Sequence, residues 1–260
     1  MKRFLITIVF IVLAISAFAQ KTTDNTLKFL GIPVDGTEQQ MIAKLKEKGF
    51  RYNTVQDNLT GQFNGETVTV YIHTNHDRVD RIYVAFPQTS SVSDIRNKYN
   101  RLINQFQENN KYFSLLGNDQ IPDDEDISYE MTVHDKQYQA SFRYMNPDMD
   151  PDYFKAQLVD AVCSLYPEEE AAKLRTTMES LFNSSDEEQK EFLAQTTEAL
   201  GKQGDVEWTP DSIQQFFAII EKFESLMTGQ VWFTIHRNYG RYNIGLYYDN
   251  LANRANGEDL

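Results

Sequence analysis

An alternation of apolar and polar residues with a period of two constrains this chain more than any other feature of its sequence. The period places successive side chains on opposite faces of a strand, and a strand with one apolar face is typical of an antiparallel sheet covering a core. The pattern occurs over residues 68–86, 129–144 and 231–248, each with a turn near its middle. Each segment predicts a hairpin, and together they predict an antiparallel sheet of about six strands.

Two helices are predicted to pack on this sheet. The first begins at Thr37, whose hydroxyl forms a capping box with Gln40, and ends at Gly49. The second follows Ser91, because apolar residues then recur at helical spacing and form a stripe able to lie on the sheet. The stripe consists of Val92, Ile95, Tyr99, Leu102, Ile103 and Phe106.

A block of helical pattern, about residues 150–228, separates the second hairpin from the third. Its four predicted helices begin near Asp150, Pro167, Ser185 and Thr209. The last helix has a wide apolar surface, so we expect it to lie between the sheet and the other helices. Replacing Phe216 or Phe223 by Ala should then cost about 3–5 kcal/mol if the ring is buried.

Strands flank the helical block on both sides. An isolated hairpin is only marginally stable in water, so the last two strands are expected to return to the sheet formed by the first ones. The sequence thus predicts an α+β fold: one domain over residues 20–260, with a four-helix insertion before the last hairpin. Cys163 is expected to point away from the apolar face of its helix, and the polar tail over residues 250–260 is expected to fray.

The first residues have the features of a secretory signal peptide. Two basic residues precede an apolar run over residues 4–15, and Ala17 and Ala19 fit the small-residue cleavage pattern. A membrane anchor is the alternative, but the run is shorter than the roughly 20 residues that cross a bilayer. We therefore expect residues 1–19 to be removed and the mature protein to be periplasmic or secreted, without a membrane span.

Charge and cysteine content narrow the possible partners. With 25 Lys+Arg against 38 Asp+Glu, the formal net charge is −13, and this charge opposes an encounter with nucleic acid or anionic lipid. Cys163 is the only cysteine, so the fold cannot contain an internal disulfide. An inert thiol is the favoured interpretation, because no base lies near Cys163 in the sequence; an exposed thiol could pair with a second molecule.

Three clusters suggest metal binding, and each has a simpler explanation. They are His73, His76 and Asp77; Asp148, Asp150 and Asp152; and residues 123–126. The first lies at a strand end and turn without further ligands, the second has a proline where a calcium loop needs glycine, and the third fits a solvated acidic loop. No hydrolase or phosphate-binding motif occurs either. We predict no metal or cofactor and assign no catalytic residue.

Aromatic and histidine side chains gather on the predicted second face of the sheet. Their positions are Tyr71, His73, Tyr83, Trp232, His236 and Tyr247. Aromatic residues on that face either pack under the helical block or form a recognition surface for a peptide, glycan or protein. These six residues are the candidate binding residues.

The stretch FLGIPVDGTEQQMIAKLKEKGF at residues 29–50, followed by GQFNG at 61–65 and strands ending at Phe86, resembles uncharacterised secreted proteins of Gram-negative gut bacteria. The ending LYYDN at 246–250 is similar to the close of the same family. More distantly, the plan of a helix followed by an antiparallel sheet resembles outer-membrane assembly lipoproteins and β-lactamase inhibitor proteins, which bind other proteins. The resemblance implies no activity and no catalytic residue.

The leading hypothesis is an exported, non-enzymatic binding module for a protein or cell-envelope partner. It would present either the second face of the sheet or a groove between sheet and helices. The alternative is a hydrolase of envelope or dietary polymers, which requires a cleft containing a histidine or carboxylate with a perturbed pKa. A third hypothesis, a structural envelope component, predicts self-association and no pocket.

Overall fold

A computed structural model describes residues 25–114, 118–146, 148–185, 187–188, 191–192, 194–195 and 210–254. Thus the expected signal peptide and Thr209 lie outside the described residues. The chain divides into two compact units, which we call the sheet unit (Asn25–Asn146 and Met227–Leu260) and the helical unit (Pro147–Leu226). The expectation that both form one domain, with the last helix against the sheet, stays a prediction.

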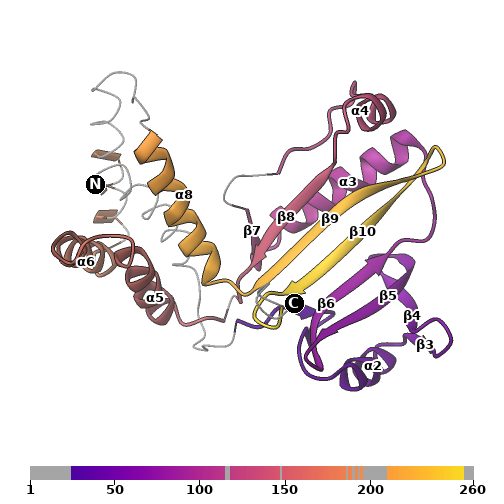
Figure 1. Ribbon diagram of the computed structural model, residues 1–260, viewed down its shortest axis with the longest axis horizontal. Helices are drawn as coiled ribbons and strands as arrows, with labels where there is room; N and C mark the ends of the chain where they lie inside the picture. The colour runs from indigo at the N-terminus through magenta and orange to yellow at the C-terminus, as the bar shows by residue number, and fades with distance from the viewer. Residues whose placement is uncertain are drawn as a thin grey trace. The chain divides into compact units, whose positions relative to one another are not determined.

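The elements confirm an α+β fold with an antiparallel sheet (Figure 1). In chain order the sheet unit contains β1 (Lys28–Phe29), β2 (Ile32–Pro33), α2 (Glu38–Glu47), β3 (Arg51–Asn53), β4 (Asn58–Phe63), β5 (Glu66–Asn75), β6 (Arg78–Ala85), α3 (Val92–Gln107), β7 (Tyr112–Phe113), α4 (Ile127–Val133), β8 (Gln139–Tyr144), β9 (Gly229–Asn238) and β10 (Arg241–Asn250). The helical unit contains α5 (Pro151–Cys163), α6 (Glu168–Phe182) and α8 (Pro210–Ser225).

The two ends of the chain share one sheet. Its eight strands run in the order β3-β4-β5-β6-β10-β9-β8-β7, and every pairing is antiparallel. The last hairpin, β9–β10, lies between β6 and β8, because β10 pairs with β6 and β9 pairs with β8. This arrangement confirms the predicted return of the final strands to the first ones.

The helical unit is inserted between two neighbouring strands. Tyr144, the last residue of β8, pairs directly with Gly229, the first residue of β9. The chain therefore leaves the sheet and re-enters it at adjacent positions, so that β8 and β9 pair as the two arms of a hairpin would. Strand pairing is continuous across the insertion.

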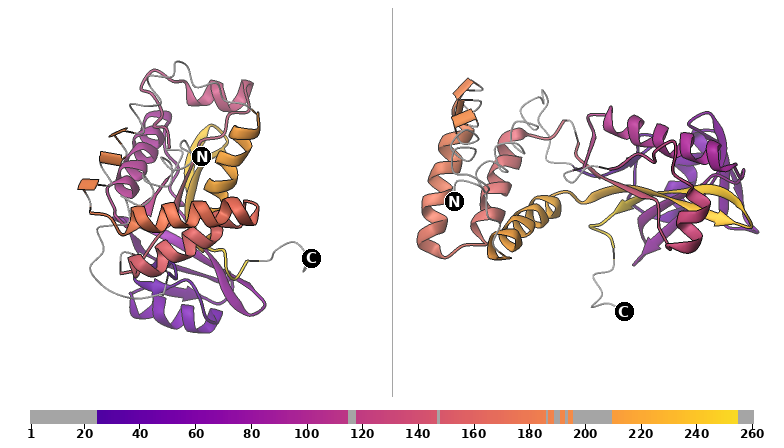
Figure 2. Two further views of the ribbon diagram at one scale, coloured as in Figure 1. Left: turned by 90° about the vertical axis from the view of Figure 1, so that its left-hand side faces the viewer. Right: turned by 90° about the horizontal axis from the view of Figure 1, so that it is seen from above.

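One face of the sheet carries the core. Residues of β5, β6, β9 and β10 at alternate positions are buried there, together with the apolar stripe of α3, in which only Val92 is partly exposed. The view from above in Figure 2 shows α3 along this face. The capping box of α2 is present as predicted, with Gln40 N donating to Thr37 Oγ1 at 3.3 Å. The predicted hairpins over 68–86 and 231–248 and both predicted helices are thus confirmed.

The predicted strand at residues 129–133 is wrong, because this segment forms α4. Asp126 caps it, accepting a hydrogen bond from Tyr129 N at 3.0 Å, and Ile127 is buried in the core. The alternation of Tyr129, Met131 and Val133 had suggested a strand, but the preceding cap residue decides for a helix. Only the second half of that hairpin, β8, exists.

The sheet also has strands that the alternation did not reveal, so the expectation of about six is too low. They are β3, β4 and β7, besides the separate two-stranded sheet β1–β2. In β4, Gly61 is a close-approach position, since a Cβ there would come within 2.4 Å of the Phe50 ring.

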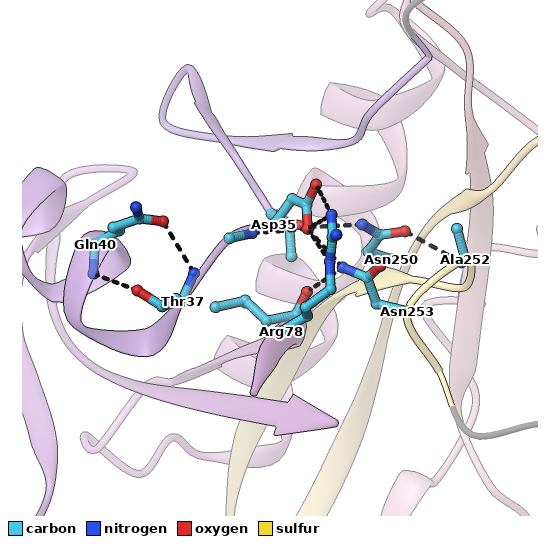
Figure 3. A network of polar contacts seen from close by, with 10 residues as sticks. Asp35, Thr37, Gln40, Arg78, Asn250, Ala252 and Asn253 are labelled. Atoms are coloured by element: carbon cyan, nitrogen blue, oxygen red, sulfur yellow. Dashed lines mark hydrogen bonds and ion pairs between the residues drawn. The ribbon is translucent and has the colours of Figure 1, made fainter. Parts of the chain in front are cut away.

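The chain after Asn250 does not fray at once, contrary to expectation. Asn250 is buried and its Nδ2 donates to Val34 O at 2.8 Å, and Asn253 Nδ2 donates to Asp35 Oδ1 at 2.8 Å (Figure 3). Arg78 joins the network through an ion pair with Asp35 at 2.7 Å. Although burial alone would raise it, the hydrogen bonds from Arg78 and Asn253 lower the pKa of Asp35. Side-chain amides that look solvent-directed in the sequence thus anchor the final segment.

The helical unit has a small core of its own. Phe223 of α8 is buried and packs edge-on against Phe154 of α5, with ring centroids 5.8 Å apart, whereas the side chain of Phe216 lies outside the described residues.

Asp150 caps α5 as predicted. Cys163 is also buried, which corrects the expectation that it points away from the packed face, and burial raises the pKa of its thiol. Of the third predicted helix, the described residues include the capping contacts between Ser185 and Glu188.

Candidate functional site

Four aromatic side chains line up across the face of the sheet opposite the core. Tyr71 of β5 pairs with Tyr83 of β6, Tyr83 with Tyr247 of β10, and Tyr247 with Trp232 of β9. We call this row the aromatic ladder. Two of its neighbouring members, Tyr83 and Tyr247, are 164 positions apart in the sequence, and the strand register alone brings them together.

The rings of the ladder are stacked. Centroid distances are 5.6 Å from Tyr71 to Tyr83, 4.6 Å from Tyr83 to Tyr247 and 3.9 Å from Tyr247 to Trp232, with interplanar angles of 20°, 15° and 6°. Stacked pairs of this kind contribute about 0.5–1.5 kcal/mol each beyond the area they bury. Because neighbouring rings face one another, the ladder presents ring edges and hydroxyl groups along its length and ring faces only at its two ends.

A buried carboxylate fixes the Trp232 end of the ladder. Asp249, on β10 two residues beyond Tyr247, accepts hydrogen bonds from Trp232 Nε1 at 2.9 Å and from Arg81 at 2.6 and 2.8 Å. The side chain of Asp249 is only 2% exposed. The hydrogen bonds to Asp249 raise the pKa of the Arg81 guanidinium, which also lies 5.7 Å from the Trp232 ring and 5.4 Å from Tyr247. The indole is therefore held in one orientation.

The hydroxyl ends of the ladder meet a histidine. The pKa of Tyr83 is raised to about 12, mainly by burial. The charge of Tyr247 and a hydrogen bond with Tyr247 also raise it. His236 Nε2 lies 3.5 Å from the Tyr247 hydroxyl, and burial lowers the pKa of His236. A Cβ at Gly245 would come within 2.7 Å of His236 Nε2, so the glycine leaves the space into which the imidazole folds.

An open groove of about 590 Å³ adjoins this end of the ladder. We call it the β9 groove. It is lined by Met131, Asp135, Lys136, Gln137, Gln139, Trp232, Thr234, Ile235, His236, Arg237 and Tyr247. Its volume lies within the range of about 300–1,000 Å³ that is common for small-molecule sites. The segment joining α4 to β8 forms one wall, and the second face of the sheet forms the other.

The structure brings together five of the six candidate binding residues. Tyr71, Tyr83, Tyr247 and Trp232 form the ladder, and His236 joins it at the groove. His73 lies on the same face opposite Arg81 but outside the groove. Its Nδ1 is 2.6 Å from Asp80, beside an irregularity in the β5–β6 register.

Several residues of this site were not among the candidates named from the sequence. They include Arg81, Gln139, Gly245 and Asp249. Arg81 and Asp249 each lie two positions from a ladder tyrosine, so the same period of two that revealed the tyrosines could have placed both charges on their face. That they pair with each other follows only from the β6–β10 register, in which Asp249 is opposite Arg81.

The acidic clusters considered as metal sites have structural roles. Asp150 and Asp126 are helix N-caps, and Glu125 accepts from Lys136 Nζ at 2.6 Å. Among the described residues no group of three or more histidine, cysteine or acidic side chains could hold a metal ion. His134 is the C-cap residue of α4, and its Nδ1 lies 2.9 Å from Glu130 Oε2.

Comparison with models of protein families, with curated proteins and with solved structures finds no match. The resemblance to secreted proteins of gut bacteria therefore stays a prediction. In the described part of the chain, no helix combines the length and apolar character needed to cross a membrane.

Proposed function

We propose that the protein is an exported binding module that recognises a cell-envelope partner through the second face of its sheet. The carrying observation is the aromatic ladder, whose Trp232 end opens on the β9 groove. Export itself is proposed from the signal-peptide pattern over residues 1–19.

The construction of the ladder supports recognition, because it is rigid before any ligand arrives. Stacking restrains each ring, and the hydrogen bonds that Asp249 accepts from Arg81 and Trp232 restrain the end that meets the groove. A partner that contacts these groups loses its own freedom but does not have to order the site. Aromatic and arginine side chains are also those that contribute most energy at interfaces.

A hydrolase is the second candidate, and His236 is the observation that favours it. Its lowered pKa keeps the imidazole neutral near pH 7, as a general base must be, and it lies in the β9 groove. Asp135 is the carboxylate that lines the same groove. Hydrolysis of envelope or dietary polymers that His236→Ala abolishes and Tyr71→Ala leaves intact would establish this candidate in place of simple binding.

The proposal is tested by affinity capture from an envelope extract. The mature protein is immobilised beside a variant with both Trp232→Ala and Tyr247→Ala, and beside Tyr153→Ala, which removes an exposed tyrosine of the helical unit. We expect a component retained by the unaltered protein and by Tyr153→Ala but lost from the double variant. Equal retention by all three, with circular dichroism showing that all are folded, contradicts recognition through the ladder.

A further inference from the structure

We infer that the β9 groove binds a saccharide, with one pyranose ring stacked on the outer face of the Trp232 indole and its hydroxyl groups hydrogen-bonded to the groove walls. This inference rests on the proposed function and names the chemistry of the ligand. It is drawn from the open indole face, the unused polar groups beside it and the strand pairing beneath it.

The outer face of Trp232 is open because of its neighbours in the sheet. On the β10 side, Tyr247 covers one face of the indole at 3.9 Å. On the β8 side, the residue opposite Trp232 is Ser141, which is too small to cover the other face. The Ser141 hydroxyl is moreover engaged with Gln230 Nε2 at 2.7 Å. A flat apolar surface of this kind matches the C–H-rich face of a pyranose ring.

Polar groups that could bind hydroxyls lie directly beside this indole face. Gln139 and Thr234 pair across β8 and β9 two residues along from Ser141 and Trp232, and Gln137 lies on the adjoining wall. Among the described residues, none of these three side chains takes part in a hydrogen bond. Each amide offers two donors and an acceptor, which suits the neighbouring hydroxyl groups of a sugar.

Strand pairing argues against a peptide bound as an added strand. β9 has β10 on one side and β8 on the other, so its backbone groups beside the groove are already used. Recognition by β9 therefore depends on its side chains. An uncharged saccharide fits them, because Lys136 of the groove wall is paired with Glu125 and Arg237 donates to Thr132 Oγ1.

His236 completes the polar lining. Its lowered pKa means a neutral imidazole near pH 7, so one ring nitrogen donates and the other accepts, as pairing with hydroxyl groups requires. Protonation at acid pH would remove the acceptor. Saccharide affinity is therefore expected to fall as the pH is lowered.

The test is a glycan array that displays peptidoglycan fragments, bacterial surface polysaccharides, host mucin glycans and plant oligosaccharides. The mature protein is compared with Trp232→Ala, with Trp232→Phe and with Tyr153→Ala, which removes an exposed tyrosine of the helical unit. We expect at least one glycan to bind the unaltered protein and Tyr153→Ala equally. Trp232→Ala should weaken that binding about tenfold or more, and Trp232→Phe should weaken it less because a ring remains.

A second measurement places the sugar on the indole. The chain has two tryptophans, so Trp208→Phe leaves Trp232 as the only indole fluorophore. The glycan identified on the array should shift and quench its emission in a saturable way, and Gln139→Leu should raise the midpoint of that titration about fivefold to tenfold.

Two outcomes overturn the inference. One is an array on which no glycan is bound, and the other is bound glycan that Trp232→Ala retains while folded. If the array is blank but capture from envelope extract still depends on Trp232 and Tyr247, the saccharide is excluded and the proposed binding function stands. If capture also fails, both the saccharide inference and the proposed binding function are contradicted.

Discussion

The two faces of the central sheet carry two ladders that differ by one residue position. On the core face, Val70, Val84, Leu246 and Phe233 lie side by side on β5, β6, β10 and β9, and all four are fully buried. One position along the same strands, the second face carries the aromatic ladder, in which Tyr71 is 39% exposed. The same pairing register thus builds a hydrophobic core on one side and a stacked, partly exposed row on the other.

The difference between the faces lies in what stabilises them. The core ladder is stabilised by removal of apolar surface from water, which is insensitive to pH and tolerates little loss of volume. The aromatic ladder is stabilised by ring stacking and by the buried carboxylate of Asp249. It should therefore accept substitutions at modest cost but respond to charge and pH.

The largest expected effect is on the core face. Phe233→Ala should lower the free energy of unfolding by about 3–5 kcal/mol, because the ring is fully buried against Tyr99, Phe106 and Phe142. Urea denaturation measures the change. Tyr239→Ala, at the exposed tip of the same hairpin, serves as control and should stay within about 0.5 kcal/mol. Similar values for both would contradict the assigned core face.

Asp249→Asn should have the next largest effect, about 2–3 kcal/mol, measured by the same denaturation. Removing one partner of a buried pair costs about 3–5 kcal/mol, and Arg81 retains some water contact that reduces the cost. Glu169→Gln breaks an exposed ion pair with Lys173 and should change stability by less than about 0.5 kcal/mol. A loss at Asp249 no larger than that at Glu169 would show that the carboxylate does not anchor the ladder.

A smaller effect is expected from Tyr83 at alkaline pH. Its pKa is raised to about 12 in the folded protein, so between pH 10 and 12 the unfolded chain releases the phenol proton first and stability falls as the pH rises. Below pH 10 the contribution is fully present. Tyr83→Phe should therefore show a shallower fall of the unfolding midpoint over this window. Parallel curves for the two proteins would mean that the hydroxyl is not buried in the ladder.

The smallest effect is expected at the exposed end of the ladder. Tyr71 has one stacking neighbour, so Tyr71→Ala should cost about 0.5–1 kcal/mol by urea denaturation. Tyr71→Phe keeps the ring and should be nearly neutral. A cost above about 2 kcal/mol for Tyr71→Ala would show that this end is packed as firmly as the core, and the contrast between the faces would disappear.

Most of the regular elements could be predicted from local sequence because their signals are local. The period of two fixed the faces of β5, β6, β9 and β10, and the capping box fixed the start of α2. The prediction of a strand over 129–133 was wrong, since three alternating residues are too few to outweigh the cap at Asp126. The strands β3, β4 and β7 were not predicted, because they are short and β4 is interrupted by Gly61.

Part of the candidate site could be predicted from the sequence: the positions of its aromatic residues, but not their contacts. Alternation alone placed the aromatic residues on the second face, but it could not say that they touch one another. Asn250 and Asn253 illustrate the same limit, because their partners Val34 and Asp35 lie more than 200 positions away. A polar side chain looks solvent-exposed in a sequence until tertiary contacts provide its partner.

By itself, then, the sequence determined the class of fold, the faces of the main strands and the segments at which helices begin, because these depend on neighbours within a few positions. Only the tertiary structure decided that β10 lies between β6 and β9, that the four rings stack in one row, and that Asp249 meets both Arg81 and Trp232. Those contacts join residues far apart along the chain. They depend on strand order and register, which are set by the packing of the whole sheet and not by any short segment of it.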